Sequence, residues 1–111
     1  QKEYIFAGFQ FQYLKLIIMN TEMNEKLRNT CETALGTLQK LNDPDTQELQ
    51  SKLEWCLGSY DHDKNPAGLV EFGSVTLQTL RDIKKEYPRK INKKVIEGLE
   101  KSLGAADQQM N

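Results

Sequence analysis

The sequence predicts an all-α protein, an antiparallel bundle of four helices preceded by an N-terminal apolar segment. Two dipeptides, Asp43-Pro44 and Asn65-Pro66, each end one run of helix-spaced apolar residues and open the next. Asp and Asn cap helices by accepting bonds from the first N–H groups, and proline fits the first turn, where its missing N–H costs nothing. With a third break at Tyr87-Pro88, these marks divide most of the chain into four amphipathic helices.

The first two predicted helices form a hairpin. The first covers residues 20–42, with Thr21 as its cap, and the second runs from about Pro44 to Tyr60. Each carries an apolar stripe at three- and four-residue steps, which predicts Leu38 and Leu53 as core residues. The connection between them is very short, so the two helices should be antiparallel.

The third helix is predicted from about Pro66 to Tyr87 and the fourth from about Lys90 to Leu103. Gly104 then acts as a C-terminal stop, and residues 105–111 read as a polar tail. The apolar stripe of the fourth helix recurs at four-residue steps: Ile91, Val95, Leu99 and Leu103.

Residues 1–19 form an apolar segment that periodicity alone does not assign. Ile5, Ala7, Phe9, Phe11 and Tyr13 alternate as a strand would, and a different subset fits a helix. A fifth helix is favoured, because a lone strand has no sheet to join. The competing possibility is a strand that pairs with its copy in a second chain. The predicted organisation is therefore this segment, a bundle domain over residues 20–104 and the tail.

The length and composition of the chain exclude several classes of protein. A chain of 111 residues forms one domain, and its net charge of −1 gives no global field that selects nucleic acid or membrane. No apolar run reaches the ~18–20 residues needed to span a bilayer. Two cysteines do not make a disulfide scaffold; Cys31 and Cys56 are predicted to face inward at similar heights as buried free thiols.

A calcium-binding loop is the only ligand set that the sequence resembles in part. Asp61, Asp63 and Asn65 match the first three positions of an EF-hand loop, but Pro66 replaces the required glycine and Phe72 the bidentate glutamate. The favoured prediction is a solvated loop, with no metal, cofactor or catalytic site; metal binding by Asp61 and Asp63 is kept as a remote alternative.

Two surfaces remain as candidate binding sites. One is a basic cluster around Tyr87, where three lysines crowd the positive N-terminal end of the fourth helix, against the usual preference for anions there. A solvated face is the more common explanation of such a run. The cluster consists of Lys84, Lys85, Arg89, Lys90, Lys93 and Lys94.

The other surface combines the N-terminal segment with Trp55, which lies off the apolar stripe of its helix. Either the chain's own N-terminal segment covers this tryptophan, or a partner does, since Trp is a frequent interface anchor. The segment holds more apolar surface than one stripe can bury. Its candidate interface residues are Phe6, Phe9, Tyr13 and Ile17.

The sequence therefore favours a small non-enzymatic interaction module, such as an adaptor, a regulator or an inhibitor-like protein, that binds another protein or a second copy of itself. The alternative is an anion- or nucleic-acid-binding protein that uses the basic cluster; salt dependence separates the two. The expected compartment is the cytoplasm, with a secreted or periplasmic location left open because the chain starts at Gln1 rather than Met.

Overall fold

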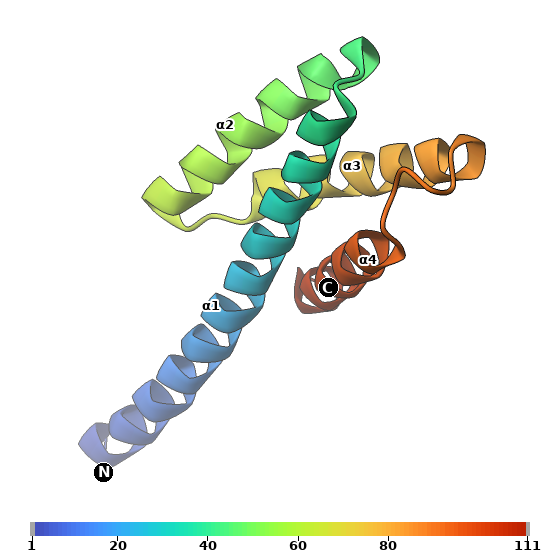
Figure 1. Ribbon diagram of the computed structural model, residues 1–111. Coiled ribbons are helices and arrows are strands. Elements are labelled where there is room, and N and C mark those ends of the chain that lie inside the picture. The colour runs from blue at the N-terminus through green and yellow to red at the C-terminus, as the bar shows by residue number, and fades with distance from the viewer. Residues whose placement is uncertain (1, 111) are drawn as a thin grey trace.

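The computed structural model describes the backbone of residues 2–110 and the side chains of residues 21–106. Within this range the chain is all-α, as predicted. The helices are α1 (Lys2–Leu41), α2 (Gln47–Asp63), α3 (Ala67–Glu86) and α4 (Lys93–Met110), with a short 3-10 turn, η1 (Pro44–Thr46), ahead of α2. Helix α1 packs against each of the other three, and α3 packs against both α2 and α4 (Figure 1).

The two predicted proline breaks are confirmed in their local chemistry. The Asp43 carboxylate accepts a hydrogen bond from the Asp45 N–H at 3.0 Å, and the Asn65 amide oxygen accepts one from the Ala67 N–H at 3.0 Å. The preceding helices both end on a residue with positive φ: Asn42 (51°) after α1 and Lys64 (61°) after α2. This left-handed ending closes a helix and turns the chain back.

The separate fifth helix predicted for residues 1–19 is not formed, and neither is the competing strand. Helix α1 is continuous from Lys2 to Leu41, so the predicted boundary at residue 20 falls inside it. Thr21, the predicted cap, is a helical residue. A cap residue permits a helix to begin but does not force a break, and no Gly or Pro stands near this point.

The fourth helix starts and ends later than predicted. Its cap is Asn92, whose side-chain oxygen accepts the Lys94 N–H at 2.9 Å. Ile91 is buried from the loop before the helix, and Ile96 takes the core position that the predicted phase gave to Val95, which is only half-buried. The predicted polar tail is helical to Met110. Gly104, the predicted stop, lies inside this helix rather than at its end.

The core lies between the four helices. Leu38 and Leu53 are both fully buried, as predicted. The hairpin of α1 and α2 is also tied on its outer side, where the Arg28 guanidinium donates two hydrogen bonds to the Asp61 carboxylate, at 3.0 and 2.9 Å. These contacts fix the half of α1 that belongs to the bundle.

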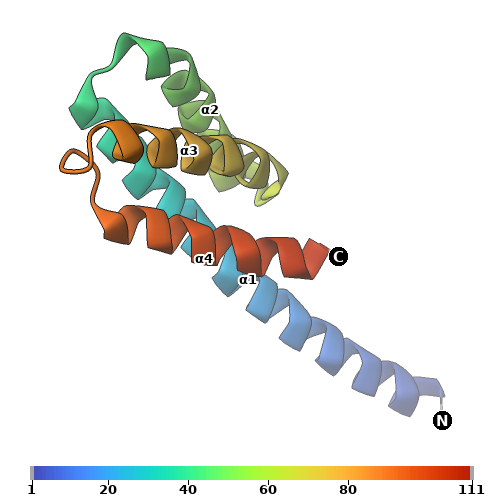
Figure 2. The same ribbon diagram turned by 90° about the vertical axis from the view of Figure 1, so that its right-hand side faces the viewer.

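Helix α1 is about twice as long as its neighbours. It has 40 residues, against 17, 20 and 18 in α2, α3 and α4. The molecule measures 63 × 24 × 18 Å, and its N-terminal end extends past the ends of the other helices in both views (Figures 1 and 2). We call residues 2–20 the projecting half of α1. No other helix runs beside its backbone.

Candidate functional site

The projecting half carries the predicted interface residues on one face of α1. Phe9, Tyr13 and Ile17 each stand 18 residues, about five turns, before Leu27, Cys31 and Leu35 respectively. These last three are buried in the bundle. The core face of α1 therefore continues by helical spacing into a region where no bundle helix lies alongside. The side chains of Phe6, Phe9, Tyr13 and Ile17 themselves lie outside the part of the chain whose side chains the structure describes.

Trp55 lies on the outer side of α2 and is 72% exposed. One of the two explanations offered by the sequence is therefore wrong: the chain's own N-terminal segment does not cover it. A straight, continuous α1 carries that segment away from α2 instead (Figure 1). Val75 of α3 is exposed as well. Cover by a partner stays a prediction.

The basic cluster around Tyr87 is not a single surface. The Lys84 ammonium donates hydrogen bonds to the carbonyls of Pro88 and Ile91, at 3.2 and 2.9 Å, and so holds the loop between α3 and α4. Lys93 pairs with Glu97 at 3.6 Å. The remaining four members are exposed: Lys85, Arg89, Lys90 and Lys94.

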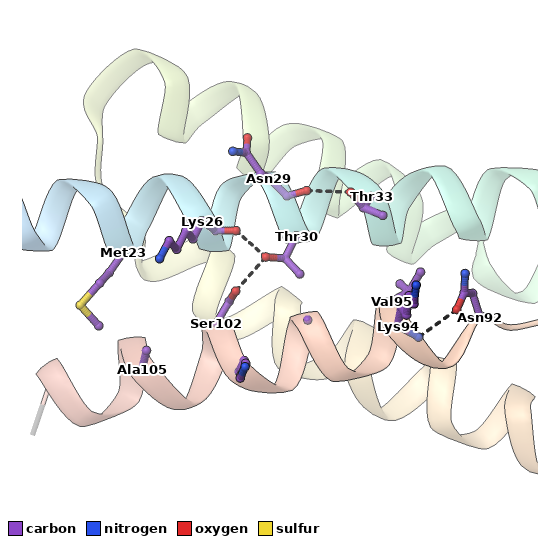
Figure 3. Close-up of a pocket in the computed structure, with 12 residues that line it drawn as sticks. Met23, Lys26, Asn29, Thr30, Thr33, Asn92, Lys94, Val95, Ser102 and Ala105 are labelled. Carbon is purple, nitrogen blue, oxygen red and sulfur yellow. Dashed lines mark hydrogen bonds between the residues drawn. The ribbon is translucent and has the colours of Figure 1, made fainter.

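A groove between α1 and α4 receives two of these lysines. Its larger part has a volume of about 840 Å³ and is lined by polar, cationic and apolar side chains, most of them from α1 and α4 (Figure 3). It continues toward the end of α1 as a hollow of about 620 Å³, with Thr33, Asn92 and Val95 common to both parts. The cationic residues that line the two parts are Lys26, Lys40, Lys90, Lys94 and Lys101.

The floor of this groove joins the two helices directly. The Thr30 hydroxyl donates to the Lys26 carbonyl of its own helix. Because a hydroxyl has a single hydrogen, the 2.8 Å bond between Thr30 and Ser102 must use the Ser102 hydroxyl as donor. A Cβ added at Gly98 would lie 3.3 Å from the Thr30 methyl group, so this glycine allows the close approach of α4 to α1.

Charge is segregated around the groove. Among the side chains that the structure describes, no Asp or Glu lines either of its two parts. Glu97 and Glu100 of α4 pair with Lys93 and Arg81 on the side that faces α3. On α1, Glu25 accepts from Tyr60 and Lys64 on the side that faces α2. These carboxylates are therefore ion-paired or hydrogen-bonded outside the groove lining, and Glu97 and Glu100 line a separate hollow of α4 together with Lys94 and Lys101.

None of the five groove lysines forms an ion pair among the residues 21–106. The ion pairs found there use Arg28, Lys52, Lys64, Arg81 and Lys93 instead. The Lys90 ammonium lies 4.6 Å from the centre of the Tyr87 ring, a cation–π contact that leaves its charge unneutralised. The sequence missed this site because its lysines come from two regions, residues 26–40 and 90–101, that lie fifty residues apart in the chain.

The two cysteines are buried free thiols, as predicted. Burial, with a smaller contribution from Cys56, raises the pKa of Cys31 to about 12. Burial likewise raises the pKa of Cys56. A thiol held in its neutral form is a poor nucleophile, so neither cysteine suits covalent chemistry.

Asp61 and Asp63 do not form a ligand set. They lie in the last turn of α2 rather than in the predicted loop. The hydrogen bonds from Arg28 hold the pKa of Asp61 below its ordinary value. The side chains that the structure describes contain no group of three or more His, Cys, Asp or Glu residues placed to hold a metal ion.

Comparison with protein-family models, curated proteins and solved structures finds no match to this chain. Within the part of the chain that the structure covers, no helix combines the length and apolar character needed to cross a bilayer.

Proposed function

We propose that this protein is a non-enzymatic interaction module that associates with a second copy of itself through the projecting half of α1. The observation that carries the proposal is the continuation of the α1 core face beyond the bundle. In the bundle, that face is covered by three helices. In the projecting half, the same face continues in the most apolar stretch of the sequence, with no helix beside it.

Burial of the apolar side chains of the projecting half would contribute enough free energy to favour association with a partner. Burying one large apolar side chain contributes about 1.5–3 kcal/mol. The segment holds ten such residues, so cover on even one side is worth on the order of 10 kcal/mol before the entropic cost of association. These residues are Tyr4, Ile5, Phe6, Phe9, Phe11, Tyr13, Leu14, Leu16, Ile17 and Ile18.

A second copy fits this surface in length and in charge. Residues 2–20 span about 28 Å of helix, close to the length of each bundle helix, so an antiparallel pair would cover the projecting half from end to end. Their charged residues are Lys2, Glu3 and Lys15, which leaves little repulsion between two copies. A two-fold pairing would bring the same face of both chains together.

The experiment is sedimentation velocity of the full chain over a wide concentration range. We expect a dimer, and we expect the double substitution Phe9→Glu with Tyr13→Glu to give a folded monomer, because two carboxylates would have to be buried in the interface. Lys15→Glu, on the opposite side of the helix, is the matched control and should leave the dimer intact. A wild-type chain that stays monomeric at high concentration contradicts the proposal.

A cytoplasmic location belongs to the same proposal. Cys31 and Cys56 are both reduced and buried in facing helices, a state that the reducing cytosol maintains. The expected mass of the native protein is that of two free thiols; a mass lower by two hydrogens would place the protein in an oxidising compartment.

A further inference from the structure

We propose that the groove between α1 and α4 binds an acidic amphipathic helix of another protein. The lysines that line it are Lys26, Lys40, Lys90, Lys94 and Lys101, without a carboxylate among the lining residues. The inference is independent of self-association, because the residues that line the groove lie outside the projecting half.

Charge complementarity defines the ligand. Among residues 21–106, five lysines line the groove and no acidic residue does. Like charges gathered along one groove repel one another, and a bound anion relieves that repulsion. The carboxylates nearest to these lysines are ion-paired elsewhere. Glu97 and Glu100 line a neighbouring hollow of α4 with Lys94 and Lys101, but they pair with Lys93 of α4 and Arg81 of α3. On α1, Glu32 pairs with Arg28, and Glu25 accepts hydrogen bonds from Tyr60 and Lys64.

The uncharged lining favours a polypeptide over a nucleic acid. The groove contains Met23, Val95 and Ala105 together with threonine methyl groups, and among residues 21–106 no aromatic residue or arginine lines it. Proteins that hold single-stranded nucleic acid stack its bases on aromatic rings and use arginine for phosphate. An apolar strip with lysines on both edges instead suits a helix that has one apolar face and acidic flanks.

The dimensions agree with a helical ligand. From Met23 to Leu41 the groove follows about 27 Å of α1, the length of a helix of about 18 residues. Gly36 lies in the lining, and a Cβ added there would meet nothing within 4 Å. This glycine therefore costs helix stability without serving the packing of the chain itself. It leaves space for an approaching helix.

The test uses fluorescence anisotropy with three labelled probes: an 18-residue peptide with leucines on one face and glutamates on both flanks, the same peptide with lysine flanks, and an oligothymidylate. The full chain should bind the acidic peptide, fail to bind the lysine peptide and bind the oligothymidylate more weakly. Binding should weaken as ionic strength rises, because the lysines are exposed.

Charge reversal locates the binding site. The double variant Lys94→Glu with Lys101→Glu should lower the affinity for the acidic peptide at least about tenfold, since two attractions become repulsions. The matched control, Lys85→Glu with Arg89→Glu, makes the same charge change outside the groove and should alter affinity by less than about twofold. All four residues are exposed, and circular dichroism of each variant checks that the fold is kept.

Steric blocking gives a second test that does not depend on charge. Gly36→Gln should lower the affinity for the acidic peptide several-fold, because its side chain fills the groove. Gly58→Gln, also at an open helical position, should leave that affinity unchanged. Failure of the wild-type chain to bind the acidic peptide overturns the inference. So does equal loss in the control variants, or tighter binding of the oligothymidylate, which would assign the lysines to nucleic acid.

Discussion

The two halves of α1 carry the same apolar face in different surroundings. From Leu27 to Leu38 the face is buried by three other helices, and from Phe6 to Ile17 the same spacing continues without them. Helical periodicity thus specifies which face of α1 is apolar. The lengths of the neighbouring helices decide how much of that face is buried within the chain. We infer that the covered half contributes to folding, and that the projecting half contributes to association.

The largest difference between the halves should appear in thiol reactivity. Tyr13 and Cys31 lie five turns apart on the same face of α1. A cysteine introduced by Tyr13→Cys should react with a thiol reagent at pH 8 at least about a thousandfold faster than Cys31, whose raised pKa leaves little thiolate. The rates are measured by mass spectrometry at protein concentrations low enough for the chain to be monomeric.

The same variant also tests the dimer. When the protein concentration is raised, the cysteine at position 13 should become protected while the rate at Cys31 stays unchanged. Slow reaction at position 13 even at high dilution would mean that the projecting half is covered within one chain, and the contrast between the halves would then be lost.

Truncation of matched residues should separate folding from association. Leu27 is fully buried, so Leu27→Ala should lower the free energy of unfolding by about 2–5 kcal/mol, independent of protein concentration. Phe9→Ala should lower apparent stability only through the dimer, so its effect should vanish on dilution. Urea denaturation at two protein concentrations distinguishes these outcomes. A large effect of Phe9→Ala in the dilute protein would place Phe9 in the folding core.

The sequence predicted those parts of the fold that depend on local chemistry. Asp43 caps the turn η1 ahead of α2, and Asn65 accepts the N–H of Ala67 at the start of α3, because a short polar side chain followed by proline leaves few alternatives for the backbone. The start of the fourth helix was misplaced although its signal was present, in Asn92 two residues before Lys94. The boundary at residue 20 was wrong because Thr21 is equally compatible with a helix interior.

The groove was not predictable in the same way. The sequence groups Lys93 with Lys94, but α4 turns Lys93 toward Glu97 on the α3 side and leaves Lys94 beside α1. The partners of Lys94 across the groove, such as Lys26, are distant in sequence. Local charge runs therefore show where lysines occur, and only the helix packing shows which of them share a surface.

Glycine-to-alanine substitutions should give a smaller difference in stability between packed and open positions. Gly58 lies in α2 with nothing within 4 Å of an added Cβ, so Gly58→Ala should raise the free energy of unfolding by about 0.5–1 kcal/mol. A Cβ at Gly73 would lie 3.2 Å from a Leu103 methyl and 3.3 Å from the Cys31 sulfur. Gly73→Ala should therefore leave the free energy of unfolding unchanged or lower it. Equal gains in thermal denaturation would mean that α3 and α4 pack more loosely than described.

The smallest effect should come from the ion pair near the point where α1 leaves the bundle. Arg28 stabilises the Asp61 carboxylate, so the pKa of Asp61 is lower in the folded protein than in the unfolded chain. Its contribution is complete above the ordinary aspartate pKa near 3.8 and is lost as the pH falls through the lower folded value. Asp61→Asn should therefore lower the urea midpoint slightly at neutral pH, and the difference from wild type should shrink in strong acid. Asp82→Asn is the control, because Asp82 bonds only to Gln78 of its own helix. A difference that persists unchanged below pH ~2 would mean that the substitution acts through the shape of the amide rather than through the lost charge.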